Sequence, residues 1–417
     1  MQIPRDRYLN ALIDRKHNGL VKVVTGIRRC GKSYLLFKLF RDHLRASGVP
    51  DDHVIAVQLD LHSARSLRDP DALLEFVYGK IKDADMHYVL LDEVQLLPDF
   101  VEVLNELLAH PSVDTYVTGS NSRFLSKDII TEFRGRGDEV HIFPLSFAEF
   151  MQTRSDDALH AWADYVEFGG LPLVATMPSE EQKTAYLLRL FEETYIKDIV
   201  ERNGLRKTQE LEDLVDVLAS AVGSLTNAAK IQATFKSALH SNISTATVRS
   251  YIDCLEDAFL VSEAKRYDIK GRKYIGAPAK YYFEDVGLRN ARLNFRQVEE
   301  THLMENVVYN ELRARGLSVD VGIVTRRYLD SEGRKVSSNL EVDFVANRGS
   351  RRYYIQSAYA MPSSAKREQE AASLRRIDDS FKKIIVVKDV MNTTRDESGI
   401  VTMGLFDFLL DPASLDR

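Results

Sequence analysis

The residues best suited to chemistry form a glycine-rich segment, Gly26-Ile-Arg-Arg-Cys-Gly31-Lys32-Ser33, which fits the pattern G-x-x-x-x-G-K-[ST]. Its glycines let backbone N–H groups point inward around phosphates, and a helix that begins near Ser33 adds its partial positive charge. Lys32 can reach the β- and γ-phosphates, and the Ser33 hydroxyl can ligate Mg²⁺. The segment therefore predicts a site for ATP and Mg²⁺. The expected nucleotide contacts in this segment are Gly26, Ile27, Arg28, Arg29, Cys30, Gly31, Lys32, Ser33 and Tyr34.

An acidic pair, Asp92-Glu93, follows the apolar run of residues 88–91. A strand that ends in acids presents carboxylates at the sheet edge where phosphates bind. We expect Asp92 to hold Mg²⁺ together with Ser33, mostly through water, and Glu93 to polarise the water that attacks the γ-phosphate. Apolar strands that end in acids are common, so this pair alone is a weak indication of a nucleotide site. Its distance behind the glycine-rich segment makes the indication specific.

Two further features could complete a hydrolytic site. Residues 118–122 (Thr-Gly-Ser-Asn-Ser) end the next apolar run, where Ser120 or Asn121 could touch the γ-phosphate or the attacking water. The alternative for these two residues is a helix N-cap, which Ser and Asn favour. Arg136 could lie at a subunit boundary and reach a neighbour's γ-phosphate as an arginine finger. The alternative for Arg136 is a solvated loop arginine.

The elements that must position these residues alternate between strands and helices. Strands are expected at residues 20–25, 53–59, 87–91, 115–118 and 139–143, and helices at residues 33–46, 73–81 and 101–110. Such alternation predicts an α/β fold with a parallel sheet that is covered on both faces. From about residue 162 to residue 207 the pattern is helical.

The middle of the chain has three helical patterns, at residues 209–220, 225–235 and 244–256, followed by strands at 260–266 and 279–283. Three helices and a hairpin form a winged helix, whose third helix would lie in a major groove of DNA. The hairpin region is basic although the chain is not, and we expect salt-sensitive contacts to the DNA backbone. The alternative is a winged helix that binds only protein. The expected DNA contacts are Thr245, Thr247, Arg249, Lys270, Arg272 and Lys273, and the basic patch also includes Lys265, Arg266 and Lys280.

The composition is that of a globular protein with several domains. The chain has 417 residues, of which 44% are hydrophobic and 28% charged, and its formal net charge is −6. This charge argues against a general nucleic-acid coat. The two cysteines, Cys30 and Cys254, are far apart in the sequence, neither sits in a metal-ligand spacing, and we expect no disulfide framework. Without an apolar leader or a run long enough to span a membrane, we expect a cytoplasmic protein with no membrane partner.

The sequence resembles the bacterial and archaeal AAA-type ATPases that carry a C-terminal restriction-endonuclease-like domain. The resemblance covers nearly the whole chain. It rests on residues 25–33, 90–93, 118–122, 135–136, 143–150 (FPLSFAEF), 168–172 (FGGLP), 305–312 (ENVVYNEL), 341–344 (EVDF) and 354–359 (YIQSAY). It implies an AAA-like P-loop core at 1–160, a helical lid at 161–207, a winged helix at 208–293 and the nuclease-like α/β domain at 294–417.

In that nuclease-like domain, the resemblance places Asp343 and Gln356 where metal ligands would be, with Glu305 as a further candidate ligand. Restriction-like nucleases also need a lysine two residues after the second ligand, and Ala358 stands there instead. We therefore expect a nuclease fold that has lost catalysis.

The function expected from these features is Mg²⁺-dependent ATP hydrolysis that drives DNA binding or remodelling. By analogy with branch-migration motors, the protein would act on duplex or branched DNA as a homo-oligomeric ring, for which a hexamer is one option. A nucleotide-dependent signalling switch, or an ATPase that acts on protein partners, is the main alternative. An ATP-regulated nuclease is disfavoured by Ala358.

Overall fold

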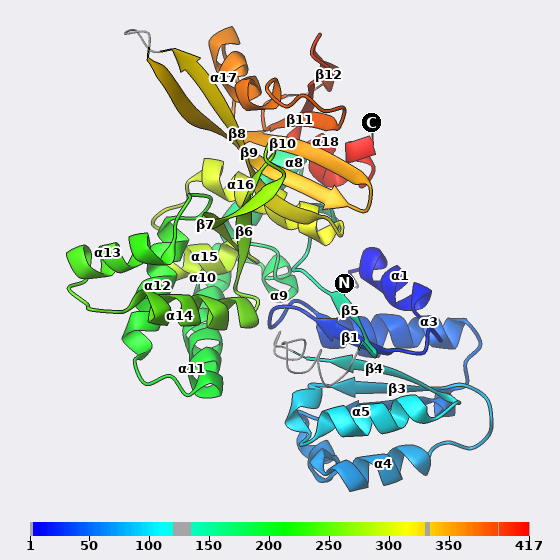
Figure 1. The fold of residues 1–417 in the computed structure, drawn as a ribbon. Coiled ribbons are helices and arrows are strands. Elements are labelled where there is room, and N and C mark those ends of the chain that lie inside the picture. Colours follow the sequence, from blue (N-terminus) through cyan, green and yellow to red (C-terminus); the bar gives the residue numbers. More distant parts are fainter. Residues whose placement is uncertain (1–2, 120–134, 330–333, 391, 417) are drawn as a thin grey trace. The chain divides into compact units, whose positions relative to one another are not determined.

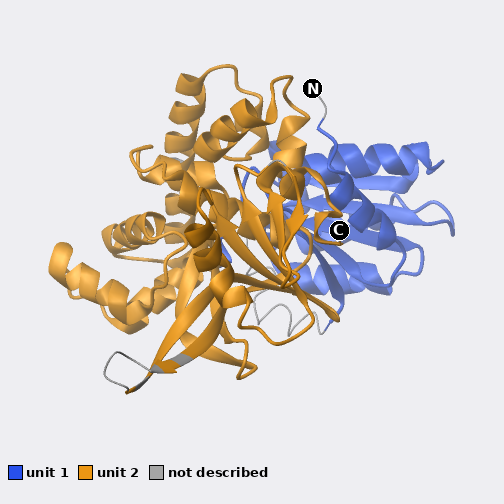
Figure 2. Cartoon of the chain, turned by 90° about the horizontal axis from the view of Figure 1, so that it is seen from above, with its two compact units in different colours: residues 1–144, 257–259 blue, residues 145–256, 260–417 orange. Residues whose placement is uncertain are grey.

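The computed structural model describes residues 3–119, 135–329, 334–390 and 392–416. The chain forms two compact units (Figure 1, Figure 2). The first contains Met1–Pro144 with Asp257–Phe259, and the second contains Leu145–Glu256 with Leu260–Arg417. Each unit is described by itself. Among the described residues, no helix is long and apolar enough to cross a membrane.

The first unit is built on the predicted parallel sheet. Its strand order is β2-β3-β4-β1-β5, and every neighbouring pair is parallel. The three central strands are buried along their whole length, as in parallel sheets that are covered on both faces. The strands are β1 (Val21–Thr25), β2 (Val54–Gln58), β3 (His87–Asp92), β4 (Val113–Thr118) and β5 (Gly137–His141).

Helices pack on both faces of this sheet. Alternate residues of the strands form one core with α4 (Pro70–Tyr78) and α5 (Phe100–Ala109). On the other face, Phe40 packs on Tyr116 of β4, with ring centroids 4.5 Å apart. Phe40 belongs to a continuous helical stretch that follows the glycine-rich segment and comprises α2 (Lys32–Tyr34), the π-helical η1 (Leu35–Phe40) and α3 (Arg41–Ala46). The remaining elements are α1 (Asp6–Asp14), η2 (Asp51–His53), η3 (His62–Arg68) and η4 (Val94–Leu96).

The second unit begins with a helical region, of which the helices labelled α10 to α14 lie together in Figure 1. Its elements are α7 (Phe147–Met151), α8 (Ala158–Phe168), α9 (Pro172–Ala175), α10 (Glu180–Leu190), η6 (Phe191–Ile196), α11 (Lys197–Asn203), α12 (Thr208–Ser220), α13 (Ala228–Ala238) and α14 (Thr245–Asp257). The Ser244 hydroxyl accepts a hydrogen bond of 3.0 Å from the Thr247 N–H, so it caps α14.

The double glycine of residues 168–172 is explained by close packing inside the second unit. A Cβ on Gly169 would lie 2.3 Å from Asp285 Oδ1, and the φ of Gly169 is +77°. The Gly170 N–H donates to Asp285 Oδ2 at 2.8 Å, and its carbonyl accepts from the Leu145 N–H at 2.7 Å. Asp285 also caps α15 (Val286–Arg292). The double glycine therefore fixes the end of α8 against the start of α15.

A mixed eight-stranded sheet forms the rest of the second unit, in the order β12-β13-β11-β10-β9-β8-β6-β7. Its strands are β6 (Val261–Asp268), β7 (Lys273–Phe283), β8 (Ser318–Leu329), β9 (Lys335–Arg348), β10 (Arg351–Ala358), β11 (Lys382–Val387), β12 (Thr394–Arg395) and β13 (Val401–Gly404). The accompanying helices are α16 (Glu300–Ala314), α17 (Ser364–Leu374), α18 (Leu405–Leu410) and η7 (Ser414–Asp416).

The predicted three helices and hairpin are present as α12, α13, α14 and β6–β7. The hairpin, however, is not a free-standing wing. Its strand β6 pairs in parallel with β8, from Arg266 opposite Val321 to Asp268 opposite Ile323. The hairpin therefore forms the edge of the large sheet, and that sheet runs across the boundary expected at residue 293. The winged-helix and nuclease-like assignments stay predictions.

Candidate nucleotide-binding site

The glycine-rich segment joins β1 to α2 at the carboxyl edge of the parallel sheet. Gly26 has a φ of +138°, and a Cβ there would lie 2.2 Å from the Ile142 carbonyl oxygen. Only glycine fits this approach. Gly31 adopts a left-handed conformation and stands at the N-cap of α2. The segment is therefore a tight P-loop that opens a helix, as its sequence predicts.

The P-loop side chains divide between the core and the surface. Ile27 and Cys30 are fully buried, so any contact of theirs with a phosphate must come from the backbone. Arg29 is exposed, Arg28 is half-buried, and Tyr34 is 39% exposed on α2.

Lys32 lies over the loop rather than in solvent. Its side chain is buried, and its Nζ donates to the carbonyl oxygens of Gly26 at 2.8 Å and Ile27 at 3.0 Å. These contacts hold a cation at the loop carbonyls, next to the loop N–H groups that can surround an anion.

Asp92 and Ser33 are brought together as the sequence predicts. Asp92 ends β3, is 2% exposed, and accepts a hydrogen bond from the Ser33 hydroxyl. Burial raises the pKa of the Asp92 carboxyl, and the nearby Glu93 and Asp60 carboxylates raise it further, while hydrogen bonds from Thr118 and Ser33 lower it. A buried carboxylate beside a hydroxyl, in an acidic neighbourhood, is a donor set that fits Mg²⁺.

Thr118 is a site residue that no sequence motif indicates. It ends β4 next to Asp92, because the β3–β4 register pairs Leu91 with Val117. Its hydroxyl donates to Asp92 Oδ1 and accepts from the Glu93 N–H at 3.0 Å. Thr118 thus fixes both acids. The signal for it was its place at the end of the strand beside Asp92.

Glu93 stands just beyond the strand in a strained conformation. Its φ is +50°, in the left-handed region that non-glycine residues rarely adopt. The side chain is half-buried and accepts a hydrogen bond from Gln95 Nε2. This turn directs the Glu93 carboxylate away from the line of the strand while its N–H stays bound to Thr118. The other two predicted residues of this edge, Ser120 and Asn121, lie outside the described residues.

Comparison with known proteins agrees with this geometry. A profile described as an AAA domain matches residues 18–151, which contain the P-loop and both acids. An uncharacterized protein of Haemophilus influenzae is 32% identical over 414 residues, which cover 98% of each chain. The chain belongs to the same family as this protein. Its first unit contains an AAA-type P-loop ATPase domain.

Other matches add less about function. An uncharacterized protein of Methanocaldococcus jannaschii is 26% identical over 375 residues, covering 86% of this chain and 79% of its own. A profile of unknown function matches residues 159–299. Among solved structures, the Aeropyrum pernix ORC1 protein in complex with DNA has a TM-score of 0.29 at 14% identity, covering 70% of this chain and 92% of its own. Cdc6p from Pyrobaculum aerophilum has a TM-score of 0.30 at 14% identity, covering 72% and 96%. At these TM-scores neither structure bears on the function of this chain.

The AAA domain places Arg136 at the edge of the sheet opposite the P-loop. The Arg136 carbonyl accepts from the N–H of Val21, the first residue of β1, at 2.9 Å. Because β1 has 5 residues and each advances about 3.3 Å, roughly 17 Å separate Arg136 from its own P-loop. The exposed side chain donates to Asn105 Oδ1 at 3.0 Å.

Two contacts that hold the P-loop of the AAA domain had no sequence signal. The buried Arg5, just before α1, donates to the Cys30 carbonyl at 3.0 Å and to the Phe143 carbonyl at 2.6 Å. Thr25, the last residue of β1, bonds Glu139 at 2.5 Å and His141 at 3.0 Å through its hydroxyl. The Arg5–Phe143 and Thr25–Glu139 hydrogen bonds join residues more than 100 positions apart, so local patterns do not reveal them.

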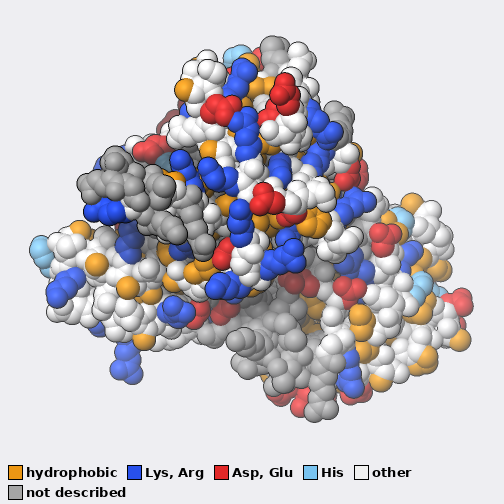
Figure 3. All heavy atoms as spheres, turned by 45° about the horizontal axis from the view of Figure 1, so that its top comes forward, with side chains coloured by type: hydrophobic (Ala, Val, Ile, Leu, Met, Phe, Trp, Pro, Cys, Tyr) orange, Lys and Arg blue, Asp and Glu red, His pale blue; other side chains and the backbone are white. Residues whose placement is uncertain are grey.

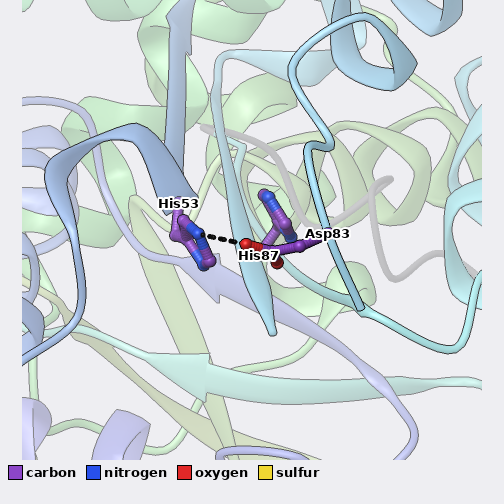
Figure 4. Close-up of side chains that lie close together, drawn as sticks. All are labelled: His53, Asp83 and His87. Carbon is purple, nitrogen blue, oxygen red and sulfur yellow. Dashed lines mark ion pairs between the residues drawn. The ribbon is translucent and has the colours of Figure 1, made fainter. Parts of the chain in front are cut away.

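A histidine pair lies at the opposite edge of the same sheet, where β2 and β3 begin (Figure 4). The rings of His53 and His87 stack with centroids 4.2 Å apart and planes within 10°. Asp83 Oδ2 lies 3.3 Å from His53 Nε2. A metal must lie close to the plane of each ring that ligates it, and these planes are nearly parallel. The arrangement is therefore a stacked pair with an ion-pair partner rather than a chelate.

The residues expected to contact DNA are distributed over α14 and the hairpin tip. Lys270, Arg272 and Lys273 are exposed at the turn between β6 and β7, and Lys270 lies 3.4 Å from Asp378. On α14, Thr245 and Arg249 are exposed and Thr247 is half-buried. On the face shown in Figure 3, Lys and Arg side chains are mixed with Asp and Glu.

The position of Lys280 differs from the sequence-based prediction of an exposed basic patch. The sequence suggests a surface lysine on the hairpin, but its side chain is 3% exposed and surrounded by acids. Lys280 is buried because its ammonium meets carboxylates of α16 and β9, which come later in the chain. The exposed basic patch is therefore smaller than predicted and centred on the hairpin tip.

Proposed function

We propose that the AAA domain hydrolyses ATP with Mg²⁺ and that hydrolysis drives action on DNA in a homo-oligomer. The observation that carries the hydrolytic part is the cluster at the carboxyl edge of the sheet. There, Ser33 bonds Asp92, and Thr118 bonds both Asp92 and Glu93. This cluster is next to a P-loop with the shape that phosphates require.

Each residue of the site would have a distinct role in ATP binding or hydrolysis. Backbone N–H groups of residues 26–33 surround the phosphates, and Lys32 exchanges its two carbonyl contacts for phosphate oxygens. Ser33 and Asp92 would hold Mg²⁺, which supplies positive charge to the phosphate oxygens when bound. Glu93 accepts a proton from the attacking water, and Ser120 or Asn121 senses the γ-phosphate.

The direct test of this site is nucleotide binding by a Lys32→Ala variant. Loss of a charge-assisted contact should weaken binding of a fluorescent ATP analogue by about tenfold or more. The matched control is Lys38→Ala, because Lys38 lies on the same helical stretch but is exposed and paired with Asp42 at 3.0 Å. Equal weakening in both variants, or in neither, would contradict the proposed role of Lys32.

Arg136 supports the oligomeric part of the proposal. A residue roughly 17 Å from its own P-loop can act on a γ-phosphate only in a neighbouring subunit. Its exposure and its position at the far sheet edge suit such a contact. A protein that hydrolyses ATP at the same rate without Arg136 would instead be a self-contained switch, the main alternative.

The DNA part rests on the exposed cations of the hairpin tip. Lys270, Arg272 and Lys273 lie together on the turn between β6 and β7, where a phosphate backbone could reach their exposed side chains. The mixture of charges around them favours a few backbone contacts over a broad basic groove. We therefore propose duplex or branched DNA as the substrate, bound without base-specific contacts by this turn.

A further inference from the structure

A buried cluster in the second unit surrounds a lysine with three carboxylates. Lys280 Nζ, from β7, lies 2.8 Å from Glu305 Oε1 of α16. It also lies 2.6 Å from Glu341 Oε1 and 3.5 Å from Asp343 Oδ1, both on β9. The three elements meet because β7 and β9 belong to one sheet and α16 packs on it.

Other polar groups hold the acids in place around the ammonium. The Tyr282 hydroxyl donates to Glu305 Oε1 at 2.6 Å, and the Ser357 N–H donates to Asp343 Oδ2 at 2.8 Å. Gln356 lies opposite Asp343 in the β9–β10 register, which pairs Ile355 with Phe344. The cluster is thus an ordered set of oxygen donors, including the residues that the sequence suggested as metal ligands.

Carboxylate oxygens are ligands that divalent cations prefer. Mg²⁺ binds carboxylate oxygens at about 2.0–2.1 Å and demands a compact shell around one centre. Here the centre is already held by the Lys280 ammonium, which is within 3.5 Å of all three acids. An ammonium and a metal ion cannot share one position, so the residues as folded do not fit a metal.

We propose that Lys280 is the built-in cation of this carboxylate site. It takes the position of a divalent ion, excludes such ions from the wild-type protein, and leaves a latent Mg²⁺ or Mn²⁺ site that opens when its charge is removed. This proposal stands apart from the proposed function, because it concerns neither the P-loop nor DNA.

The test is Mn²⁺ binding by full-length Lys280→Met without nucleotide, followed by electron paramagnetic resonance. All proteins carry Asp92→Asn, so that the P-loop site contributes no ion. The proposal predicts a gain of one bound Mn²⁺ per chain over the parent, and loss of that ion when Asp343→Asn is added. The matched control is Lys183→Met, because Lys183 is also buried in this unit and lies 2.7 Å from Asp164. This control should gain no ion.

Two outcomes would overturn the proposal. One is Mn²⁺ binding by the Asp92→Asn parent that Asp343→Asn abolishes, since Lys280 would then not exclude the ion. The other is a folded Lys280→Met protein that binds no more Mn²⁺ than the parent.

Lys280→Met could unfold the chain, since removing one partner of a buried ion pair is strongly destabilising. In that case Lys280→Met/Glu341→Gln is used, because it removes one charge of each sign and Glu341 is the most exposed of the three acids. Mn²⁺ should raise the midpoint of thermal unfolding of this double variant and leave the parent's midpoint unchanged. No increase in the double variant would overturn the proposal.

Discussion

At the scale of single residues, the nucleotide site depends on one threonine that carries no charge. The Thr118 hydroxyl donates a hydrogen bond to the Asp92 carboxylate and accepts one from the Glu93 N–H. Since both acids are proposed to act on the same phosphate, their relative position is set through this hydroxyl.

Replacing Thr118 with valine keeps the shape and removes the hydroxyl. We expect a stability loss of about 1–3 kcal/mol from the unpaired groups. We also expect ATP turnover to fall on the order of 100-fold, because small displacements of catalytic groups are costly. Denaturant unfolding and steady-state hydrolysis measure the two effects.

The control for this prediction lies on the same strand. Thr115 is 1% exposed, and its hydroxyl has no hydrogen-bond partner among the described residues. Thr115→Val should therefore leave both stability and turnover unchanged or slightly improved. A Thr118→Val protein that behaves like Thr115→Val would refute the anchoring role.

The residues of the site differ in how far the sequence could predict them. Lys32, Ser33, Asp92 and Glu93 follow from local motifs, because each motif dictates a strand end or a helix start. Thr118 depends on the pairing of β3 with β4, which a motif does not specify. The burial of Lys280 depends on strands and a helix that follow it, so its sequence neighbourhood, which is basic and exposed, suggests the wrong environment.

At the scale of elements, strand–helix alternation predicted the parallel sheet correctly. The strand order β2-β3-β4-β1-β5 is not sequential, and the alternation contains no information about it. The hairpin β6–β7 shows the same limit. Its two strands were expected from apolar runs and turn residues, but its attachment to β8 arises from a register between segments about 55 positions apart.

The hairpin tip carries the proposed DNA contact. We expect the triple change Lys270→Glu, Arg272→Glu and Lys273→Glu to weaken duplex and four-way junction binding and to reduce the salt slope. Each lost phosphate contact should lower the magnitude of d log K/d log[salt] by about 0.9. Fluorescence anisotropy at several salt concentrations gives this slope.

A charge-matched control separates local contacts from net charge. Lys197, Lys207 and Lys236 are exposed on or next to α11, α12 and α13, and changing all three to glutamate alters the net charge equally. This control should lose much less affinity. Equal losses would point to a diffuse electrostatic effect, and no DNA binding by the wild type at about 50 mM salt would end the DNA proposal.

At the scale of the whole molecule, the proposed mechanism requires each subunit to supply Arg136 to the ATP site of a neighbouring subunit. Arg136→Ala should bind ATP normally but lose turnover by about 1000-fold, the usual contribution of an arginine finger. Mixing it with Glu93→Gln should restore activity. In a mixed ring, Glu93→Gln subunits donate Arg136 to sites that still contain Glu93.

The mixing experiment distinguishes a ring from a switch. A self-contained subunit would show no recovery on mixing, whatever the activity of each variant alone. Recovery that disappears on dilution, as followed by light scattering, would tie turnover to assembly.

The central claim is that Glu93 activates water at a site where ATP is held by the P-loop and Asp92. It is tested most directly by measuring ATP binding and single-turnover hydrolysis of Glu93→Gln beside Glu102→Gln, a change of the same type on the exposed face of α5. The account predicts that both bind ATP like the wild type. Only Glu93→Gln should hydrolyse it more slowly, by about 100-fold or more. Wild-type hydrolysis by Glu93→Gln would contradict the account and place the base elsewhere.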